Sequence, residues 1–303
     1  MKLTVKGLIA SLLLLVGLSA HAADDGLKPF VLAKTLKGAD MAATITSTKE
    51  ALTANGFEIA GEYSPYKNAT LIVITNDEMK SNAAKTEFGG YGAAQRVSIT
   101  QVKDEIQIAY TNPTYMAAVY RLDGDLAGIT AKLESTLGKE ATYGTGEVRT
   151  ADKLRKYNYM FGMEKFDSTG KHKLAEYGSY EDAVKAVEAG LSGGKGGVSK
   201  VYRIDIPGKK ETVFGVAIAD DEGKENKGAD KYIMERIDFA DVKSTAHLPY
   251  EILVSDNTAY HLFARFRIAI NFPDLKMMGD NSFMSIMSAP GAIKKSLRTA
   301  VKD

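Results

Sequence analysis

The chain carries short runs in which apolar and polar residues alternate, and polar turns separate most of these runs. A period of two is the pattern of a half-buried strand. In the first half it predicts strands at residues 28–36, 57–63, 69–75, 96–102 and 106–113. The capping-box pair Ser47 and Glu50, with a stop at Gly56, predicts a helix over 47–54, and a second helix is predicted at about 77–85.

The second half repeats this order of elements. Strands are predicted at residues 157–166, 198–206, 212–219, 250–254 and 266–273. Ser179 caps a helix that ends at Gly190, and another helix is predicted at 228–237. Consecutive strands joined by short polar turns form hairpins. The sequence therefore predicts an α+β protein made of mainly antiparallel sheets with helices packed on them.

Two segments carry an internal similarity at the level of residues. Ile108-Ala109 in the first half matches Ile268-Ala269 in the second, and Pro113 matches Pro273. A shared order of elements with matching residues indicates two tandem domains of similar structure. We predict a first domain at 23–138, a linker at 139–154 and a second domain at 155–303, with residues 1–22 preceding them as a separate segment.

The same segments resemble a known family. Leu248-Pro249 leads into a strand, and after a polar turn the next predicted strand ends at Asn271 and Pro273. This is similar to the C-terminal signature of domain-of-unknown-function family 302, and residues 48–57 and 110–115 resemble other parts of it. The first half departs from the pattern because it lacks the Leu-Pro pair. The family has no assigned reaction, so the resemblance implies a compact α+β domain and no active-site residues.

The first 22 residues have the three parts of a secretory signal peptide. Lys2 and Lys6 are followed by an apolar run at 8–18, and Ala20 and Ala22 are the small residues that signal peptidase recognises. The apolar run is shorter than the roughly 20 residues that cross a bilayer. We predict cleavage after Ala22 and a mature protein in the bacterial periplasm, with no membrane span after cleavage.

Composition narrows the classes of function. The formal net charge is +1, and it becomes −1 once the predicted signal removes two lysines, so no nucleic-acid partner is expected. The chain has no cysteine. Disulfides, thiolate metal sites, iron–sulfur clusters and a cysteine nucleophile are therefore excluded. An exported chain of this kind depends on its hydrophobic core for stability, and no cofactor is predicted.

Tyrosine is abundant, and tryptophan is absent. A tyrosine side chain offers a large apolar area with one polar tip, which suits a small-ligand site. Several tyrosines fall at a predicted strand end and on the helix after it, and polar residues occupy the corresponding region of the second half. The candidate ligand-binding residues are Tyr110, Asn112, Tyr115, Tyr120, His261 and Asn271. We expect such a site in the interdomain cleft or in the loops after the hairpins.

Metal binding offers two alternative functions. His247 and His261 are predicted near the same end of the second sheet, and with a further carboxylate they would suit a metal-dependent hydrolase. Thioether sulfur suits Cu(I), so a methionine-rich segment would suit a periplasmic copper carrier. Its members are Met277, Met278, Met284 and Met287. Packing of these adaptable side chains in the core or in a greasy groove is the favoured explanation of the segment.

No convincing catalytic arrangement emerges from the sequence. Ser192 lies in a Gly-x-Ser-x-Gly pattern, but a helix precedes it and a strand follows it, which is the reverse of a nucleophile elbow. We therefore favour a binding protein over an enzyme. The leading hypothesis is an exported periplasmic protein that binds a small molecule or a periplasmic protein, with the hydrolase and the copper carrier as alternatives.

Overall fold

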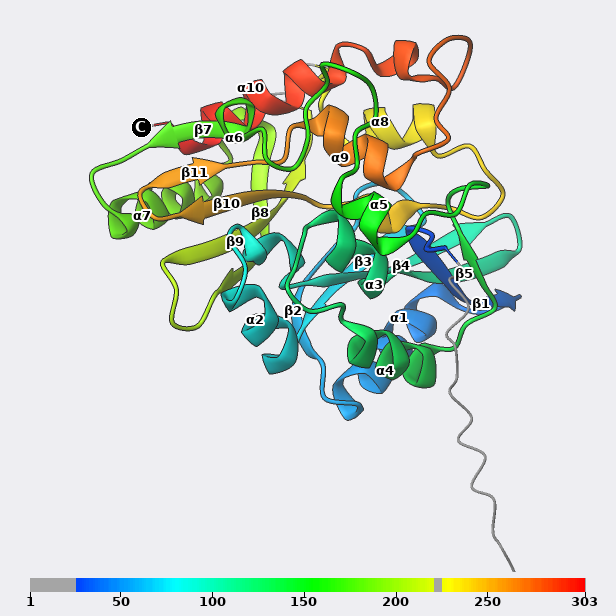
Figure 1. Ribbon diagram of the computed structural model, residues 1–303. Helices are drawn as coiled ribbons and strands as arrows, with labels where there is room; N and C mark the ends of the chain where they lie inside the picture. Colours follow the sequence, from blue (N-terminus) through cyan, green and yellow to red (C-terminus); the bar gives the residue numbers. More distant parts are fainter. Residues whose placement is uncertain (1–25, 221–224, 303) are drawn as a thin grey trace, which may run out of the picture.

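The computed structural model of the protein describes residues 26–220 and 225–302 (Figure 1). The predicted signal peptide at 1–22 lies outside the described residues. In the ranges that the structure describes, no helix is both long enough and apolar enough to cross a membrane. The fold is α+β, as predicted, and it contains two antiparallel sheets.

The first sheet has six strands in the order β2-β3-β4-β5-β1-β6, and every neighbouring pair is antiparallel. The strands are β1 (Phe30–Lys37), β2 (Glu58–Tyr63), β3 (Ala69–Thr75), β4 (Gln95–Val102), β5 (Glu105–Thr111) and β6 (Ala141–Tyr143). The helices are α1 (Met41–Ala54), α2 (Asp77–Ala84), α3 (Pro113–Val119), α4 (Ala127–Leu137) and α5 (Ala151–Arg155), with a 3-10 turn η1 (Gly89–Gly92) before β4. Helices α1 and α4 pack together below this sheet, on the side away from the second half (Figure 1).

The second sheet has five strands in the order β7-β11-β10-β9-β8, again antiparallel throughout. The strands are β7 (Lys173–Glu176), β8 (Val198–Asp205), β9 (Glu211–Ile218), β10 (Tyr250–Ser255) and β11 (Thr258–Tyr260). The helices are α6 (Thr169–His172), α7 (Tyr180–Ser192), α8 (Asp230–Ile237), α9 (Ala264–Asn271) and α10 (Ala289–Val301), with 3-10 turns η2 (Lys195–Gly197), η3 (Thr245–His247) and η4 (Phe283–Ile286). Helices α7 and α10 pack on each other and on this sheet.

The two sheets follow the same path. Strands β1 to β5 of the first sheet correspond in chain order to strands β7 to β11 of the second. The order across the first sheet is β2-β3-β4-β5-β1, and the order across the second is β8-β9-β10-β11-β7, so corresponding strands occupy the same places. In both halves a helix follows the first strand and another follows the third. The segment 139–154, predicted as a linker, contains β6, which pairs with β1, and α5, which packs on α3.

Two predicted strands in the second half are wrong. Residues 157–166 form turns and irregular structure, and residues 266–273 fall mostly in helix α9. Phe266, Ile268 and Ile270 alternate as in a strand, but Arg267 between them is equally buried. A helix that is buried on all sides shows no polar face, so its pattern imitates a strand. The proposed match of Ile268 with Ile108 therefore joins a helix to a strand.

The first helix begins earlier than predicted. It starts at Met41 and not at Ser47, because the side chain of Asp40 accepts a hydrogen bond from the Ala43 N–H at 2.8 Å and caps it there. Its predicted end is confirmed, with Asn55 as the C-cap. In the second half the Ser179 cap is also confirmed, since its hydroxyl accepts from the Asp182 N–H at 3.1 Å.

The halves meet where the edge strands β2 and β8 approach each other. Both strands are bulged at this point, β2 between Ile59 and Gly61 and β8 between Lys200 and Tyr202. A Cβ at Gly61 would lie only 2.3 Å from the Val201 carbonyl oxygen, so only glycine fits here. Each bulge bends its strand and ends regular pairing, which lets two edges pack without forming one continuous ladder.

Candidate functional site

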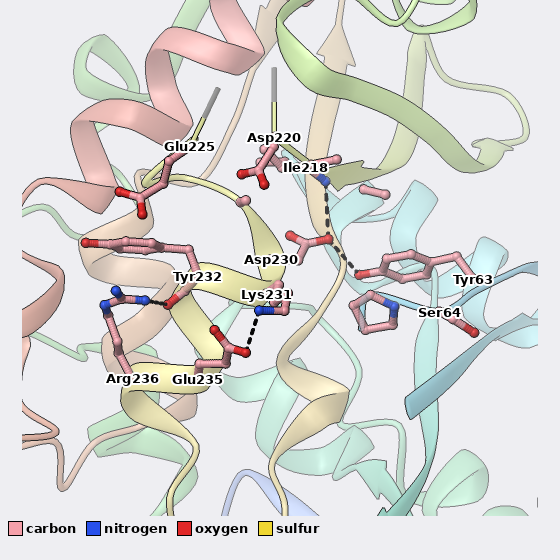
Figure 2. A pocket seen from close by; sticks show the side chains of 14 residues that line it. Tyr63, Ser64, Ile218, Asp220, Glu225, Asp230, Lys231, Tyr232, Glu235 and Arg236 are labelled. Carbon is pink, nitrogen blue, oxygen red and sulfur yellow. Dashed lines mark hydrogen bonds and ion pairs between the residues drawn. The ribbon is translucent and has the colours of Figure 1, made fainter. Parts of the chain in front are cut away.

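A cavity of about 340 Å³ opens between the two halves at the beginning of α8 (Figure 2). The end of β2 forms one wall, and the end of β9 and the first two turns of α8 form the others. Its lining residues are Tyr63, Ser64, Pro65, Ala217, Ile218, Ala219, Asp220, Glu225, Ala229, Asp230, Lys231, Tyr232, Glu235 and Arg236. We call this the α8 cleft. It requires both halves, because Tyr63–Pro65 belong to the first half and the rest to the second.

Asp230 is the buried carboxyl of the α8 cleft. It is the first residue of α8, and only 2% of it is exposed. One oxygen, Oδ2, accepts hydrogen bonds from the Ile218 N–H and from the Tyr63 hydroxyl, each at 3.2 Å. The other oxygen, Oδ1, is buried without a hydrogen-bond partner among the described residues. A buried acceptor that lacks a partner beside a cavity points to a donor that the described residues do not supply.

Burial raises the pKa of Asp230 to about 7, although the hydrogen bonds from Ile218 and Tyr63 act in the opposite direction. The same burial, with the Asp230 charge as a second cause, raises the pKa of Tyr63 well above its ordinary value. Tyr63 therefore stays protonated and remains a donor. Asp230 can hold a proton near neutral pH while the cavity is unoccupied and release it when a cation arrives.

The other charges of the α8 cleft leave it negative. Lys231 is paired with Glu235 at 2.6 Å, and the Arg236 guanidinium lies 3.5 Å from the centre of the Tyr232 ring. Both cations are thus engaged with their own helix. The carboxylates of Asp220 and Glu225 lie on the other side of the opening, and Figure 2 shows them above Asp230. A cavity with four carboxyls and two engaged cations favours a positively charged ligand.

A second cavity, of about 430 Å³, lies at the opposite end of α8. It is lined by residues 142–146 of the first sheet and its following loop, and by segments 237–244 and 272–275. Its walls are more apolar and include the rings of Tyr143, Phe239 and Phe272. The Oδ1 of Asp238 accepts from the Ser244 N–H at 2.9 Å, and burial raises the pKa of this carboxyl to about 7. Helix α8 thus carries a buried carboxyl at each end.

A buried charge network joins the halves between the two sheets. The Glu251 carboxylate of β10 pairs with Arg96 of β4 and with Arg267 of α9, and none of the three is more than 4% exposed. Arg267 also donates to the His247 carbonyl at 2.7 Å and to the His247 Nδ1 at 3.3 Å. Burial and then the two arginines lower the pKa of His247, so its ring is neutral. We interpret this network as a structural contact that holds the two halves together.

The predicted ligand-binding residues lie in the core and not in either cavity. They are Tyr110, Asn112, Tyr115, Tyr120, His261 and Asn271, all buried. Several bind backbone carbonyls: Tyr115 donates to Ile270 at 2.7 Å, Asn112 to Lys28 at 2.9 Å and Asn271 to Arg267 at 3.0 Å. These three side chains therefore bind the backbone of the fold, whereas the Tyr120 hydroxyl and both ring nitrogens of His261 are buried without a partner among the described residues.

The structure does not bring His247 and His261 together as metal ligands. His247 lies in η3, before β10, and the hairpin register places Leu253 opposite Tyr260, so the strand position next to His261 is about six residues from His247 along the chain. His247 already uses both ring nitrogens, one with Arg267 and one with the Tyr250 hydroxyl at 3.1 Å. Across residues 26–220 and 225–302, no group of three or more His, Cys, Asp or Glu side chains is placed to hold a metal ion.

The four methionines of the candidate copper segment lie between α9 and α10. They are exposed, from 37% for Met277 to 76% for Met278, so the explanation by core packing is wrong. The residues that line the α8 cleft are not among the candidates from the sequence, because nothing in the local pattern of Asp230 separates a buried carboxyl from an exposed one.

Comparison with known proteins assigns no family to the chain. No protein-family model matches the chain, and neither the curated proteins nor the solved structures include a match to it.

Proposed function

We infer that the protein is a non-enzymatic, exported binding protein and that the α8 cleft binds a small organic cation, an amine on an apolar body. The observation that carries this proposal is Asp230, a buried carboxyl with one oxygen free of partners in the wall of the cavity. An ammonium group there would meet a carboxylate held in place by Ile218 and Tyr63. A charge-assisted hydrogen bond in a buried site is among the stronger polar contacts.

The volume and the lining residues of the α8 cleft limit the size and the chemistry of the rest of the ligand. A volume of about 340 Å³ lies at the small end of ligand sites and suits a molecule with one ring or a short chain. Tyr63 and Tyr232 lie on opposite sides of Asp230 in Figure 2, and tyrosine rings provide apolar area and attract cations. Within the described residues Asp230 is hydrogen-bonded only to Ile218 and Tyr63, so it is not paired with a nucleophile. This favours binding over catalysis.

Calorimetric titration of the mature chain with tyramine tests the proposal. Tyramine carries a primary ammonium on a two-carbon chain attached to a phenol ring. The matched ligand control is 3-(4-hydroxyphenyl)propionate, which has a carboxylate in place of that ammonium. We expect tyramine to bind and the acid not to bind. Asp230→Asn should weaken tyramine binding by at least about tenfold, since loss of a charged hydrogen bond costs about 1.5–3 kcal/mol.

Asp238→Asn is the matched protein control. Asp238 is a buried carboxyl at the other end of the same helix, and it does not line the α8 cleft. This variant should bind tyramine as the parent does. Equal binding by the Asp230→Asn variant, or binding of the acid and the amine alike, would reject the α8 cleft as a cation site.

A further inference from the structure

Methionine dominates the exposed apolar side chains of the second half. Of the eight large apolar side chains that the described residues expose, five are methionines: Met160, Met277, Met278, Met284 and Met287. The chain also uses methionine in its core, where Met79, Met116 and Met234 are buried. Two populations of methionine therefore exist, and the surface population is gathered on one segment and the loop beside it.

Main-chain hydrogen bonds join the backbones of three of the surface methionines. The Met284 N–H donates to the Met277 carbonyl at 3.2 Å, and the Met287 N–H donates to the Met284 carbonyl at 3.3 Å. The hydroxyl of Tyr159, the neighbour of Met160, donates to the Met277 sulfur. We call Met277, Met278, Met284 and Met287 the thioether cluster. Its members lie on one short loop that is closed on itself by main-chain hydrogen bonds.

In the turn η4, buried and exposed apolar residues alternate, and the exposed ones are methionines. Phe283 and Ile286 are buried and anchor the turn, whereas Met284 and Met287, one position further along, are 50% and 60% exposed. Single exposed apolar side chains are ordinary, but several of one type gathered on one short segment form a patch, which is an informative observation. Methionine is the one apolar residue of this chain whose side chain contains a donor atom for soft metal ions.

We propose that the thioether cluster binds one soft monovalent cation, Cu(I) or Ag(I). Thioether sulfur is a neutral, polarisable ligand that selects Cu(I) over the hard divalent ions. A thioether carries no proton in the accessible pH range, so no proton has to leave when the metal binds. The site also needs no cysteine or histidine, which agrees with a chain that lacks cysteine and buries His172, His247 and His261.

Native mass spectrometry with Ag(I), which needs no reductant, tests this site. The mature chain is titrated with silver nitrate in chloride-free ammonium acetate, with millimolar free methionine present to remove ions held by a single thioether. We expect one Ag(I) per chain. The variant Met277→Leu/Met284→Leu/Met287→Leu keeps the apolar surface but loses the sulfurs, and it should lose Ag(I) affinity by at least about tenfold. Because these side chains are exposed, the variant should keep the parent's melting temperature.

Met41→Leu, on helix α1 of the first half, is the matched control and should bind Ag(I) as the parent does. Affinity should be the same at pH 5 and pH 7, whereas a histidine site would weaken about tenfold or more on acidification. Absence of a bound ion in the parent would overturn the proposal. So would full retention of Ag(I) in the triple leucine variant, which would leave the cluster as an apolar contact surface.

Discussion

The two halves of the molecule share one strand path but use it for different purposes. Helices α2 and α8 occupy the same place in that path, each has eight residues, and each begins with aspartate. The side chain of Asp77 is 99% exposed at the molecular surface, whereas Asp230 is 2% exposed in the α8 cleft. The same residue at the same position is thus an exposed helix-start carboxylate in one half and a buried carboxyl in the wall of a cavity in the other.

The junction shows a second contrast. Arg96 and Glu251 are each the second residue of matched strands, β4 and β10, and they pair with each other across the junction. The turns before these strands also reach across: the Gly90 N–H of η1 donates to Glu211 at 2.6 Å, and the Thr100 hydroxyl donates to Thr245 of η3 at 2.9 Å. Opposite charges at matched positions favour contact between unlike halves, since two copies of one half would place like charges together.

The largest expected effect comes from removing the carboxylate at this junction. Glu251→Gln leaves Arg96 and Arg267 buried without their counter-ion, and we expect a loss of about 3–5 kcal/mol in the free energy of unfolding. Urea denaturation measures it. Glu235→Gln, which breaks the exposed pair with Lys231, is the control and should cost less than about 1 kcal/mol. A loss below about 1 kcal/mol for Glu251→Gln would show that the network does not hold the halves.

The contact between the edge strands should be the next most sensitive. Gly61→Ala places a Cβ against the Val201 carbonyl, and overpacking of this kind costs about 1–3 kcal/mol. Gly170→Ala is matched to it, because a Cβ at Gly170 meets nothing within 4 Å. Thermal unfolding followed by circular dichroism should show a lower melting temperature for the first variant only. Similar melting temperatures for both would mean that β2 and β8 can separate without cost.

The comparison of Asp77 with Asp230 gives a pH-dependent prediction. Because the folded-state pKa of Asp230 is raised to about 7, the folded protein retains a proton that the unfolded chain loses above about pH 4. Its contribution to stability is complete below pH 4 and is lost as the pH rises to 7. The stability of Asp230→Asn should therefore rise relative to that of the parent by on the order of 4 kcal/mol between pH 4 and pH 8.

Urea denaturation at the two pH values measures this gain. Asp77→Asn is the control, and we expect it to change stability by less than about 1 kcal/mol at either pH. A constant difference between the Asp230→Asn variant and the parent from pH 4 to pH 8 would contradict the burial of an ionisable carboxyl.

The smallest expected effect is on ligand binding. An ammonium ligand needs the ionised carboxylate, so the affinity for tyramine should rise about tenfold from pH 6 to pH 8, while the amine itself stays protonated. Calorimetric titration at both pH values measures the change. A pH-independent affinity would place the ammonium elsewhere than at Asp230.

Patterns with local causes were predicted well. Strands β3 and β4 follow from the alternation and composition of residues 69–75 and 96–102, and helix α7 follows from its Ser179 cap. Helix α9 was not predicted, because burial on every side removes the polar face by which a helix is recognised. Of the candidate tyrosines, Tyr110 and Tyr115 donate to backbone carbonyls, and the hydroxyl of Tyr120 is buried without a partner among the described residues.

The sequence by itself determined the α+β class, most hairpins, the order of elements in the first half and the absence of thiol chemistry. These properties depend on spacing, caps and composition, which are local. Only the tertiary structure decided which of two helix-start aspartates is buried, which arginine meets which carboxylate and which methionines face solvent. Those outcomes depend on how distant segments pack, and a residue's burial, pKa and availability as a ligand are set by neighbours that are far away in the chain.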